Sequence, residues 1–484
     1  MSENPFINEP YAPAPESTKV AIKDTYGLFI ENDFVPAEDG STRESLNPAT
    51  GKLIARVAEA GKADVDKAVQ AARRAYEKTW SRMAPAERGK YLYRLARLIQ
   101  ERSRELAVLE SMDGGKPIRE SRDVDIPLVA AHFFYYAGWA DKLDYAFPNR
   151  TWSPHGVAGQ IIPWNFPLLM AAWKLAPALA CGNTVVLKPA EFTPLTALYL
   201  AELVQEAEFP PGVINILTGG SEAGRSIVEH EDVNKIAFTG STEVGKLIQR
   251  SLAGTGKPYT LELGGKAAHI IFEDAAIDQA VEGIVNGIFF NQGHVCCAGS
   301  RLLVQEGIAD ELMRKLEYRI QTLIVGNPLD KNTDIGAINN QPQCNKIHEF
   351  LEEAREEGLE MVDGGQELPE EGFWCRPTIV KNAPQSSRIV REEVFGPVLA
   401  VQTFRNPDEA IEKANNTRYG LSGGVWTDKG SKIFKITNAV QAGVLWANTF
   451  NKFDPTAPFG GYKESGIGRE GGLHGLVPYV RLGD

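Results

Sequence analysis

Apolar residues recur at helical spacing through the first part of the chain. Between residues 63 and 78, and again between 86 and 111, they return every three or four positions, which is typical of amphipathic helices. The run from Gly114 to Pro117 ends the second region, because glycine and proline stop helices. Ahead of them, the apolar run from Tyr26 to Ile30, followed by Asn32-Asp33, predicts a strand and a turn.

From Gly156 onward, short apolar runs alternate with helical patterns. We predict buried strands over residues 157–163, 184–189, 213–217 and 235–239, with helices over 168–180, 195–206 and after 242. A second series follows Glu262, with a strand at 268–272 and helices near 275–290 and 308–324. Such alternation predicts an α/β fold: a Rossmann-like cofactor domain with a mostly parallel sheet, then a second α/β domain.

Length and composition limit the classes of protein to consider. A chain of 484 residues is too long for one core, so we expect two or three domains. The net charge of −12 and a pI near 5.3 argue against a nucleic-acid binder and do not favour anionic membrane surfaces. No apolar run approaches the ~20 residues of a transmembrane helix. The N-terminus lacks a basic region followed by an apolar stretch, so no signal peptide is expected.

Cysteine usage points to a reducing compartment. The five cysteines are scattered and odd in number, which makes a poor disulfide framework, so we expect free thiols and a cytoplasmic protein. The chain has no HExxH and no paired CxxC, and its seven histidines are scattered, so no metal site is expected. Residues 1–24, rich in Pro, Asn, Glu and Ala, predict a flexible arm.

Two segments offer the minimum for covalent catalysis, a nucleophile and a base. Cys296 and Cys297 are adjacent and are framed by Gly293, Ala298 and Gly299, which leave room for a substrate. Amide donors near such a thiol would favour its thiolate. The alternative is that these cysteines are small core residues, the commoner role of buried cysteine.

Glu262, between two leucines and before two glycines, is the candidate base. Strand alternation would expose its carboxylate, whereas an apolar site would raise its pKa and suit it to base work. Positions 262 and 296 are 34 residues apart, so only folding could bring them together.

Polar and small residues follow several predicted strands. Gly240-Ser241 lies between a strand and a helix, where backbone N–H groups could receive a phosphate or simply cap the helix. Lys188 and Glu191 follow another strand end, where an acid could hold ribose hydroxyls or lie in a solvated loop. Asn165, in the segment from Pro163 to Pro167, could donate to an oxyanion or belong to a plain turn.

Taken together, these segments resemble the NAD(P)-dependent aldehyde dehydrogenase superfamily. The resemblance runs from about Tyr26 to the C-terminus and is carried, in family order, by the motifs PWNFP, KPAE, FTGSTEVG, LELGGK, NQGHVCCAGS, EEVFGP and PFGGYKESG. Because the motifs occur jointly and in order, the resemblance makes the structural alternatives above improbable.

The resemblance implies roles for individual residues. Cys296 matches the family nucleophile, Glu262 the general base, and Asn165 the oxyanion donor together with the backbone N–H of Cys296. Cys297 matches the neighbouring, non-catalytic cysteine. The cofactor-binding positions are Ile162, Trp164, Lys188, Glu191, Gly220, Gly224, Gly240, Ser241, Glu393 and Phe395.

The implied reaction is the oxidation of an aldehyde to a carboxylic acid. The thiolate attacks the aldehyde, hydride transfer gives a thioester, and Glu262 activates the water that releases the acid. Glu191 would repel a 2′-phosphate, so NAD is expected rather than NADP. Two other functions remain open: acyl transfer to coenzyme A, which Glu262 argues against, and a catalytically silent NAD-binding relative.

The resemblance also implies a division of the chain. We expect the NAD-binding domain in residues 25–130 and 153–262, the catalytic domain in 263–455, and an oligomerisation flap in 131–152 and 456–484. Both flap segments are shorter than in tetrameric relatives, which favours a homodimer and puts a tetramer in doubt. The Val295-Cys296-Cys297 run resembles the family-16 subgroup.

We expect the pocket that binds the substrate, a small-molecule aldehyde, to be lined by apolar residues. Residues that fall where relatives line the entry tunnel are Phe166, Met170, Trp173, Phe290, Val295, Phe453 and Phe459. Such walls favour aliphatic or aromatic aldehydes over charged ones, although each residue could instead be ordinary core.

Overall fold

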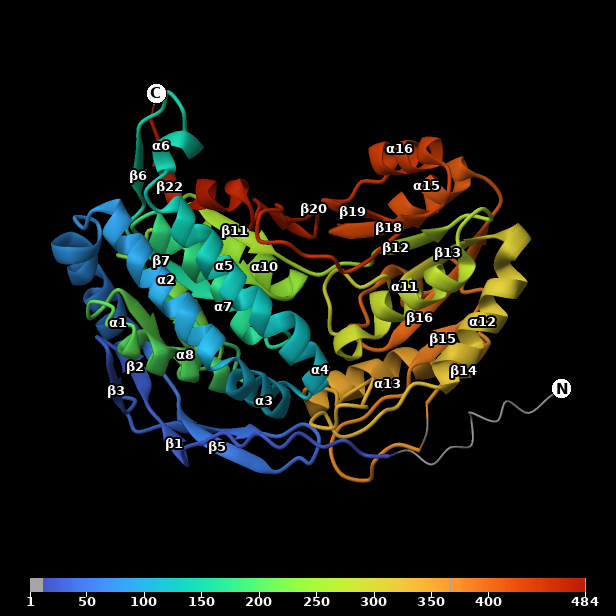
Figure 1. The fold of residues 1–484 in the computed structure, drawn as a ribbon, viewed down its shortest axis with the longest axis horizontal. Coiled ribbons are helices and arrows are strands. Elements are labelled where there is room, and N and C mark those ends of the chain that lie inside the picture. The colour runs from blue at the N-terminus through green and yellow to red at the C-terminus, as the bar shows by residue number, and fades with distance from the viewer. Residues whose placement is uncertain (1–11, 366, 484) are drawn as a thin grey trace.

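Two mainly parallel sheets, each covered by helices, form the two halves of the molecule (Figure 1). The computed structural model describes residues 12–365 and 367–483. Within this part of the chain, the first sheet has the strand order β21-β11-β10-β7-β8-β9-β2-β3. Its strands are β2 (Leu28–Ile30), β3 (Asp33–Val35), β7 (Val157–Ile161), β8 (Thr184–Lys188), β9 (Ile214–Ile216), β10 (Lys235–Thr239), β11 (Tyr259–Glu262) and β21 (Gly466–Ile467).

The central strands of this sheet are buried on both faces. The residues of β7, β8 and β10 are all buried, as expected for parallel strands between two helical layers. One face packs on α2, α5 and α7, which lie in front of the sheet in Figure 1, and the other packs on α1, α9 and α10. The helices are α1 (Lys62–Ala75), α2 (Pro85–Glu101), α3 (Ser103–Gly114), α5 (Ile126–Trp139), α7 (Pro167–Ala180), α8 (Leu195–Glu206), α9 (Ser221–Glu229) and α10 (Thr242–Leu252).

Most predicted elements of this half are confirmed, with two interruptions. The expected helix over 86–111 breaks at Arg102, which divides it into α2 and α3. The expected strand over Tyr26–Ile30 is interrupted at Gly27, where a Cβ would lie 2.6 Å from the carbonyl oxygen of Val35. The predicted stop at Gly115 is confirmed, since this residue caps α3 in the left-handed conformation.

The chain passes from the first sheet to the second between Glu262 and Ala268. In the described residues the second sheet has the order β14-β15-β16-β13-β12-β18-β19, and all neighbours are parallel except β14 and β15. Its strands are β12 (Ala268–Ile271), β13 (Arg301–Gln305), β14 (Met361–Asp363), β15 (Thr378–Val380), β16 (Val398–Phe404), β18 (Ser422–Trp426) and β19 (Val444–Ala447).

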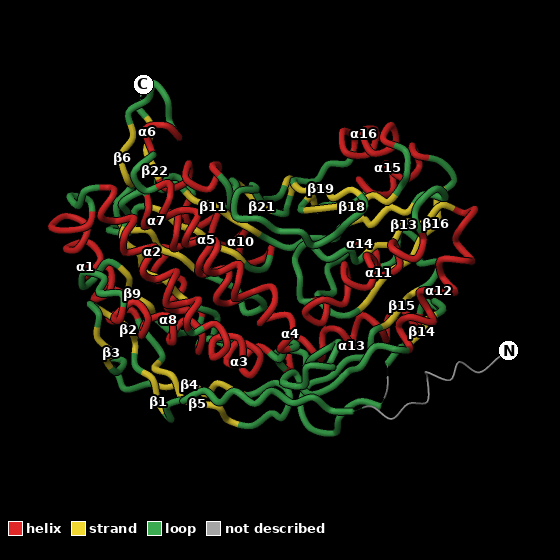
Figure 2. The backbone as a smooth tube through the Cα atoms, viewed as in Figure 1, coloured by secondary structure: helices red, strands yellow, loops and turns green. Residues whose placement is uncertain are grey.

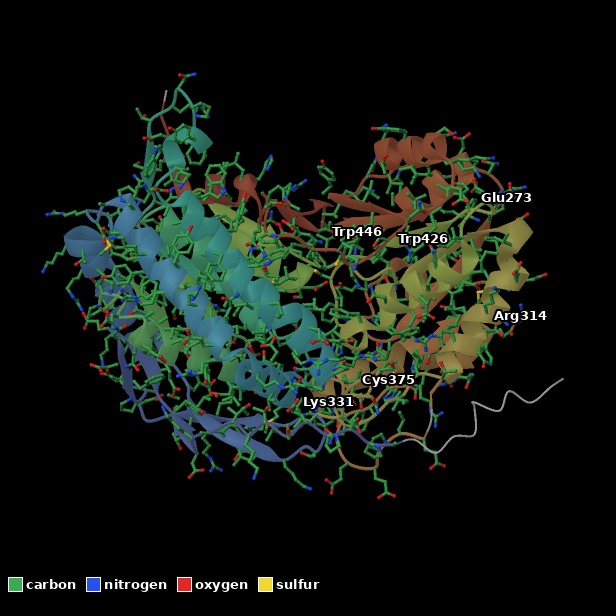
Figure 3. All side chains as sticks on the ribbon, viewed as in Figure 1. Glu273, Arg314, Lys331, Cys375, Trp426 and Trp446 are labelled. Atoms are coloured by element: carbon green, nitrogen blue, oxygen red, sulfur yellow. The ribbon has the colours of Figure 1, made fainter. Side chains whose placement is uncertain are left out.

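Helices surround this second sheet, and Figure 2 shows its strands as a band separate from those of the first half. The helices are α11 (Ile277–Phe289), α12 (Ala309–Gln321), α13 (Gln341–Glu356), α14 (Arg388–Arg391), α15 (Pro407–Asn415) and α16 (Gly430–Ala439). Trp426 and Trp446, labelled in Figure 3, stand on the neighbouring strands β18 and β19. The predicted α/β character of both halves is thereby confirmed.

The N-terminal segment differs from the expected flexible arm. Residues 1–11 lie outside the described residues, but Ala14 and Glu16 exchange backbone hydrogen bonds with the segment 329–331 of the second half. The carboxylate of Glu16 also pairs with Arg104. Residues 12–24 are therefore held by both halves of the molecule before the chain enters a small sheet of β1 (Thr25–Tyr26), β4 (Thr42–Leu46) and β5 (Leu53–Ala58).

A small projection carries the C-terminal end of the described chain (Figure 1). It contains α6 (Leu143–Ala146) and an antiparallel pair of strands, β6 (Trp152–Pro154) and β22 (Val480–Leu482). Of the residues expected to form the flap, Leu143–Ala146 and Val480–Leu482 lie in this projection, whereas residues 131–139 belong to α5 in the first half. Residues 456–484 also supply β21, which pairs with β11 of the first sheet. Among the described residues, no helix is long and apolar enough to cross a membrane.

Candidate active site

The carboxyl ends of the first sheet's parallel strands bring distant parts of the sequence to one edge. Lys188 at the end of β8 pairs with Ile161 on β7, and Glu262 at the end of β11 pairs with Thr239 on β10. Ile162 follows β7 and donates its N–H to the carbonyl oxygen of Lys188 at 3.1 Å. Ligands bind at this edge in doubly wound sheets, so the fold puts the predicted cofactor residues where a nucleotide would lie.

One cavity between the two halves contains all three predicted catalytic residues, Cys296, Glu262 and Asn165. All seven predicted substrate residues line it as well: Phe166, Met170, Trp173, Phe290, Val295, Phe453 and Phe459. Five predicted cofactor residues border the same cavity, namely Trp164, Gly240, Ser241, Glu393 and Phe395. Residues from two sheets and several loops therefore share one continuous space.

A tight turn precedes the cysteine pair. Asn291 and Gln292 have φ values of 49° and 54°, in the left-handed region that side chains other than glycine rarely adopt. The side-chain amide of Asn165 donates to the carbonyl oxygen of His294 at 2.8 Å, and Asn291 donates to the carbonyl oxygen of Asn165 at 2.8 Å. These reciprocal bonds join the predicted oxyanion donor to the loop that carries Cys296.

The Cys296 thiol is half-buried and sits beside the Cys297 thiol. The hydrogen bond with Cys297 and burial together raise the pKa of Cys296 well above its ordinary value. The backbone N–H of Cys297 lowers this pKa, as expected of an amide donor near a thiolate, but the other two causes outweigh it. Because this shift favours the protonated thiol, attack on a carbonyl needs a proton acceptor within the cavity.

Glu262 lies in a buried site, only 4% exposed, rather than on an open strand face. Burial raises the pKa of its carboxyl well above the ordinary value, and the nearby Glu470 adds to this effect. Neither carboxyl oxygen has a hydrogen-bond partner among the described residues. Gly460 makes room for the carboxyl, since a Cβ there would lie 2.9 Å from its Oε1. A free carboxyl with a raised pKa is suited to accept a proton near neutral pH.

A buried ion pair that the sequence did not reveal lies beside this base. Lys174, fully buried on α7, pairs with Glu470, which also lines the cavity. Lys174 opposes the rise in the pKa of the Glu262 carboxyl. One signal could have identified it: Lys174 is the only charged residue in the apolar helix Pro167–Ala180. Its partner lies 296 positions away, where no local pattern marks it.

The residues expected to hold the adenosine end lie outside that cavity, along the same sheet edge. Lys188 is buried and donates to the carbonyl oxygens of Pro189 at 2.9 Å and Gly219 at 2.8 Å. Burial lowers the pKa of Lys188, and the charge of Glu191 opposes that effect. A Cβ at Gly224 would lie 3.5 Å from Cε of Lys188, while one at Gly220, the N-cap of α9, would lie 3.3 Å from Arg43.

The middle of the expected cofactor site contains buried hydroxyls without partners. Ser241 caps α10, its Oγ accepting from the N–H of Val244 at 3.3 Å. The hydroxyls of Thr239 and Thr242, on either side of it, are buried and have no hydrogen-bond partner in the described chain. A helix N-terminus with free donors fits the phosphates of a dinucleotide.

The far side of the cavity carries Glu393 and Phe395. Glu393 accepts a hydrogen bond from the N–H of Gly265 at 3.0 Å, and burial raises its pKa to about 7. Phe395 has a φ of 57°, and Gln343 donates to its carbonyl oxygen at 2.9 Å. Its ring lies 5.2 Å from Trp164, centroid to centroid. This strained loop is held against the segment from Pro163 to Pro167.

Aromatic rings form much of the remaining wall. The rings of Phe166 and Phe290 stack with centroids 6.2 Å apart. Trp173, Phe453 and Phe459 form a second group with centroid distances of 5.3 to 6.4 Å. The apolar lining thus comes from α7 and two distant loops, and it suits an apolar ligand.

Comparisons with known proteins point to one family across nearly the whole chain. The family model described as "Aldehyde dehydrogenase family" matches residues 34–482. Human retinal dehydrogenase 2 is 49% identical over 468 residues, covering 94% of this chain and 90% of the human protein. Rat mitochondrial aldehyde dehydrogenase is 47% identical over 467 residues, covering 94% of this chain and 90% of the rat protein. The NAD+ complex of an aldehyde dehydrogenase from Bacillus cereus superimposes with a TM-score of 0.92 at 42% identity, covering 96% and 98%.

The chain belongs to the aldehyde dehydrogenase family, and the resemblance seen in its motifs is confirmed.

Proposed function

We propose that this protein oxidises an aldehyde to a carboxylic acid with NAD+, through a thioester on Cys296. The observation that carries the proposal is the single cavity shared by Cys296, Glu262 and Asn165. A nucleophile, an acid–base group and an amide donor in one enclosed space are the components that acyl chemistry requires.

Acylation begins at the Cys296 thiol. Its sulfur bonds to the aldehyde carbon and its proton passes to an acceptor in the cavity, where Glu262 has two free carboxyl oxygens. The amide of Asn165 and the N–H of Cys296 stabilise the oxygen of the resulting thiohemiacetal. Bound NAD+ supplies the hydride acceptor that converts this adduct into a thioester.

The cofactor would be held by residues of both halves. Lys188 and Glu191 would bind the adenosine ribose, the N-terminus of α10 at Ser241 would bind the pyrophosphate, and Glu393 with Phe395 would hold the nicotinamide end. The hydroxyls of Thr239 and Thr242, which have no hydrogen-bond partner in the described chain, could donate to the phosphates of such a ligand. The Bacillus cereus relative is described as an NAD+ complex, which supports the same cofactor here. The carboxylate of Glu191 disfavours the 2′-phosphate of NADP.

Deacylation uses Glu262 as the base. Its carboxyl first releases to solvent the proton taken from Cys296. The carboxylate then takes a proton from a water, the water oxygen adds to the thioester carbon, and the carbon–sulfur bond breaks; Glu262 returns the proton to the sulfur as the acid leaves. The ion pair of Lys174 and Glu470 lies beside this base, with Lys174 stabilising its ionised form and Glu470 opposing it.

Glu262 distinguishes the proposed function from the two alternatives. An enzyme that transfers the acyl group to coenzyme A has no use for a water-activating carboxyl, and a silent relative has no need of both Cys296 and Glu262. The aromatic walls favour aliphatic or aromatic aldehydes over charged ones.

We propose a homodimer in the cytoplasm as the setting of this activity. The small projection built from β6 and β22 supports a reduced interface, and five free cysteines fit a reducing compartment. Light scattering of the purified protein distinguishes a dimer from a tetramer, and fractionation of the source cells tests the compartment.

The experiment that tests the function is NADH formation over a panel of aldehydes, with wild-type protein, Cys296→Ala and Glu262→Gln. We expect turnover with apolar aldehydes, none with Cys296→Ala, and a slow steady state with Glu262→Gln, because this variant lacks both the acceptor for the thiol proton and the base that activates water. Normal NADH formation by Cys296→Ala would remove the nucleophile assignment. NAD+ binding without turnover of any aldehyde would favour the silent relative, and an acyl-coenzyme A product would favour the transferase.

A further inference from the structure

The turn before the nucleophile is held in an unfavourable backbone conformation. Asn291, Gln292 and Gly293 have consecutive positive φ values of 49°, 54° and 74°. Side chains other than glycine resist this region, so two such residues in a row persist only where surrounding contacts fix them. The turn leads through His294 and Val295 directly to Cys296, so its geometry sets where the sulfur lies.

The contacts that fix the turn come from segments far away in the sequence. Gln292 donates from Nε2 to the carbonyl oxygen of Ala337 at 3.0 Å. A Cβ at Gly293 would lie 2.1 Å from the carbonyl oxygen of Gly396, so the two backbones are in close contact there. At Asn291, the first left-handed residue, the N–H donates to Oε2 of Glu120 at 2.8 Å.

Glu120 reaches this N–H from the other half of the molecule. It is the last residue of α4 (Ile118–Glu120), 171 positions before Asn291, and only 6% exposed. It borders a small surface pocket that also contains Glu282, while Phe290 lines both this pocket and the main cavity. Glu120 therefore reaches the turn from the small pocket, whereas Cys296 lines the main cavity.

We propose that Glu120 is a positioning residue for the nucleophile: its carboxyl oxygen holds the N–H of Asn291 and so keeps the strained turn, and with it Cys296, in the reactive arrangement. The amide of Asn165 depends on the same turn, because it donates to His294 and its own carbonyl accepts from Asn291. A shift of the turn would displace the sulfur and the oxyanion donor together.

The proposed role needs an oxygen acceptor rather than a charge. Burial raises the pKa of Glu120 to about 8, so the carboxyl is largely protonated near neutral pH, while the N–H of Asn291, followed by Arg119 and Lys116, acts against this rise. A protonated carboxyl retains an accepting oxygen, and the amide of glutamine offers the same oxygen at the same reach. Glu120→Gln should therefore preserve the contact, whereas Glu120→Ala and the shorter Glu120→Asp should lose it.

The test compares these three variants with wild type and with Glu282→Ala as the matched control. Glu282 borders the same small pocket but pairs with Arg319 at 2.7 Å and not with the turn. Two readouts are independent of turnover: hydrogen exchange of the peptide covering residues 289–297, and the rate of Cys296 alkylation by iodoacetamide. Thermal unfolding reports whether each variant folds, and kcat and KM with NAD+ and an apolar aldehyde complete the set.

We expect Glu120→Ala and Glu120→Asp to exchange faster over 289–297, to change the alkylation rate, and to lower kcat about tenfold to a hundredfold with little change in the KM for NAD+. Glu120→Gln should restore all three towards wild type, and Glu282→Ala should match wild type. If Glu120→Ala does not fold, the test rests on Glu120→Asp, which keeps a carboxyl at position 120 but is too short to reach the N–H of Asn291. Wild-type exchange and alkylation in a folded Ala or Asp variant would overturn the proposal, as would Gln behaving like Ala.

The kinetic part rests on the function proposed above, but the other two readouts do not. If wild-type protein oxidises no aldehyde, the proposed function fails, while exchange and alkylation still decide whether Glu120 holds the turn.

Discussion

The side-chain amide of Asn165 lies 2.8 Å from the carbonyl oxygen of His294, two residues before the nucleophile. Asn165 follows a strand of the first sheet, whereas His294 belongs to the loop ahead of the second sheet's β13. This contact joins the two halves at the point where chemistry is proposed. The amide can therefore make two interactions: one of its N–H hydrogens donates to the loop, and the other is available to an oxyanion.

Replacing Asn165 with alanine should remove both the hydrogen bond to the loop and the oxyanion donor. We expect kcat to fall about a hundredfold to a thousandfold, the range measured when one oxyanion donor is removed from an enzyme. Steady-state NADH formation measures the change. Asn345→Ala, at an exposed position on α13, is the matched control and should behave as wild type. A kcat within a few fold of wild type for Asn165→Ala would exclude the oxyanion role.

Removing the neighbouring thiol should make Cys296 more acidic. The hydrogen bond with Cys297 is the largest cause of the raised pKa of Cys296, so Cys297→Ala should lower that pKa. The measurement is the rate of Cys296 alkylation by iodoacetamide from about pH 6 to pH 10, since only the thiolate reacts. The midpoint should move to lower pH than in wild type. A midpoint that stays or rises would show that burial, rather than Cys297, controls the thiol.

Neutralising Glu191 should relax the choice of cofactor. Glu191→Gln removes the charge that repels a 2′-phosphate, so kcat/KM for NADP+ relative to NAD+ should rise about tenfold, equivalent to about 1.4 kcal/mol. Glu222→Gln, exposed in the first turn of α9, is the charge-matched control. An unchanged ratio would place the ribose contact on another residue.

A buried histidine should make stability depend on pH. His269 is fully buried, its Nε2 accepts from Trp426 at 2.7 Å, and burial lowers its pKa to about 3. In the unfolded chain its pKa is about 6.5, so the unfolded state binds more protons between about pH 3 and 6.5, and stability falls as the pH falls through this window.

The difference between wild type and His269→Gln isolates this effect. The titrating carboxyls are common to both proteins and cancel, while the glutamine oxygen can still accept from Trp426. Between pH 7 and pH 5, wild type should lose about 2 kcal/mol of unfolding free energy relative to the variant. Urea unfolding at the two pH values measures it. Parallel losses in the two proteins would show that His269 does not titrate on unfolding.

Long periodic segments were predictable because their pattern is local. The helix predicted over 195–206 coincides with α8, and the strand over 235–239 coincides with β10. The break at Arg102 was not predictable, because apolar spacing continues through it. The segment 12–24 was expected to be flexible because its own composition buries little, yet its partners at 329–331 lie more than 300 residues away.

The residues of the candidate site also divide into those that the sequence predicted and those that it did not. The motifs identified Cys296, Glu262 and Asn165, since each lies in a short, recognisable run. Lys174, Glu470 and Glu120 were missed, because their importance depends on partners 171 to 296 positions distant. The raised pKa of Cys296 was not predicted, because it depends on burial and on the orientation of one neighbouring thiol.

The sequence by itself determined the α/β class, the family and the residue types available for chemistry, because these follow from apolar periodicity and from motifs read along the chain. Only the tertiary structure decided that the thiol, the carboxyl and the amide share one cavity, and how burial changes their pKa values. The reason is physical: electrostatic and packing energies depend on distance in space, and folding brings together groups that the chain keeps far apart.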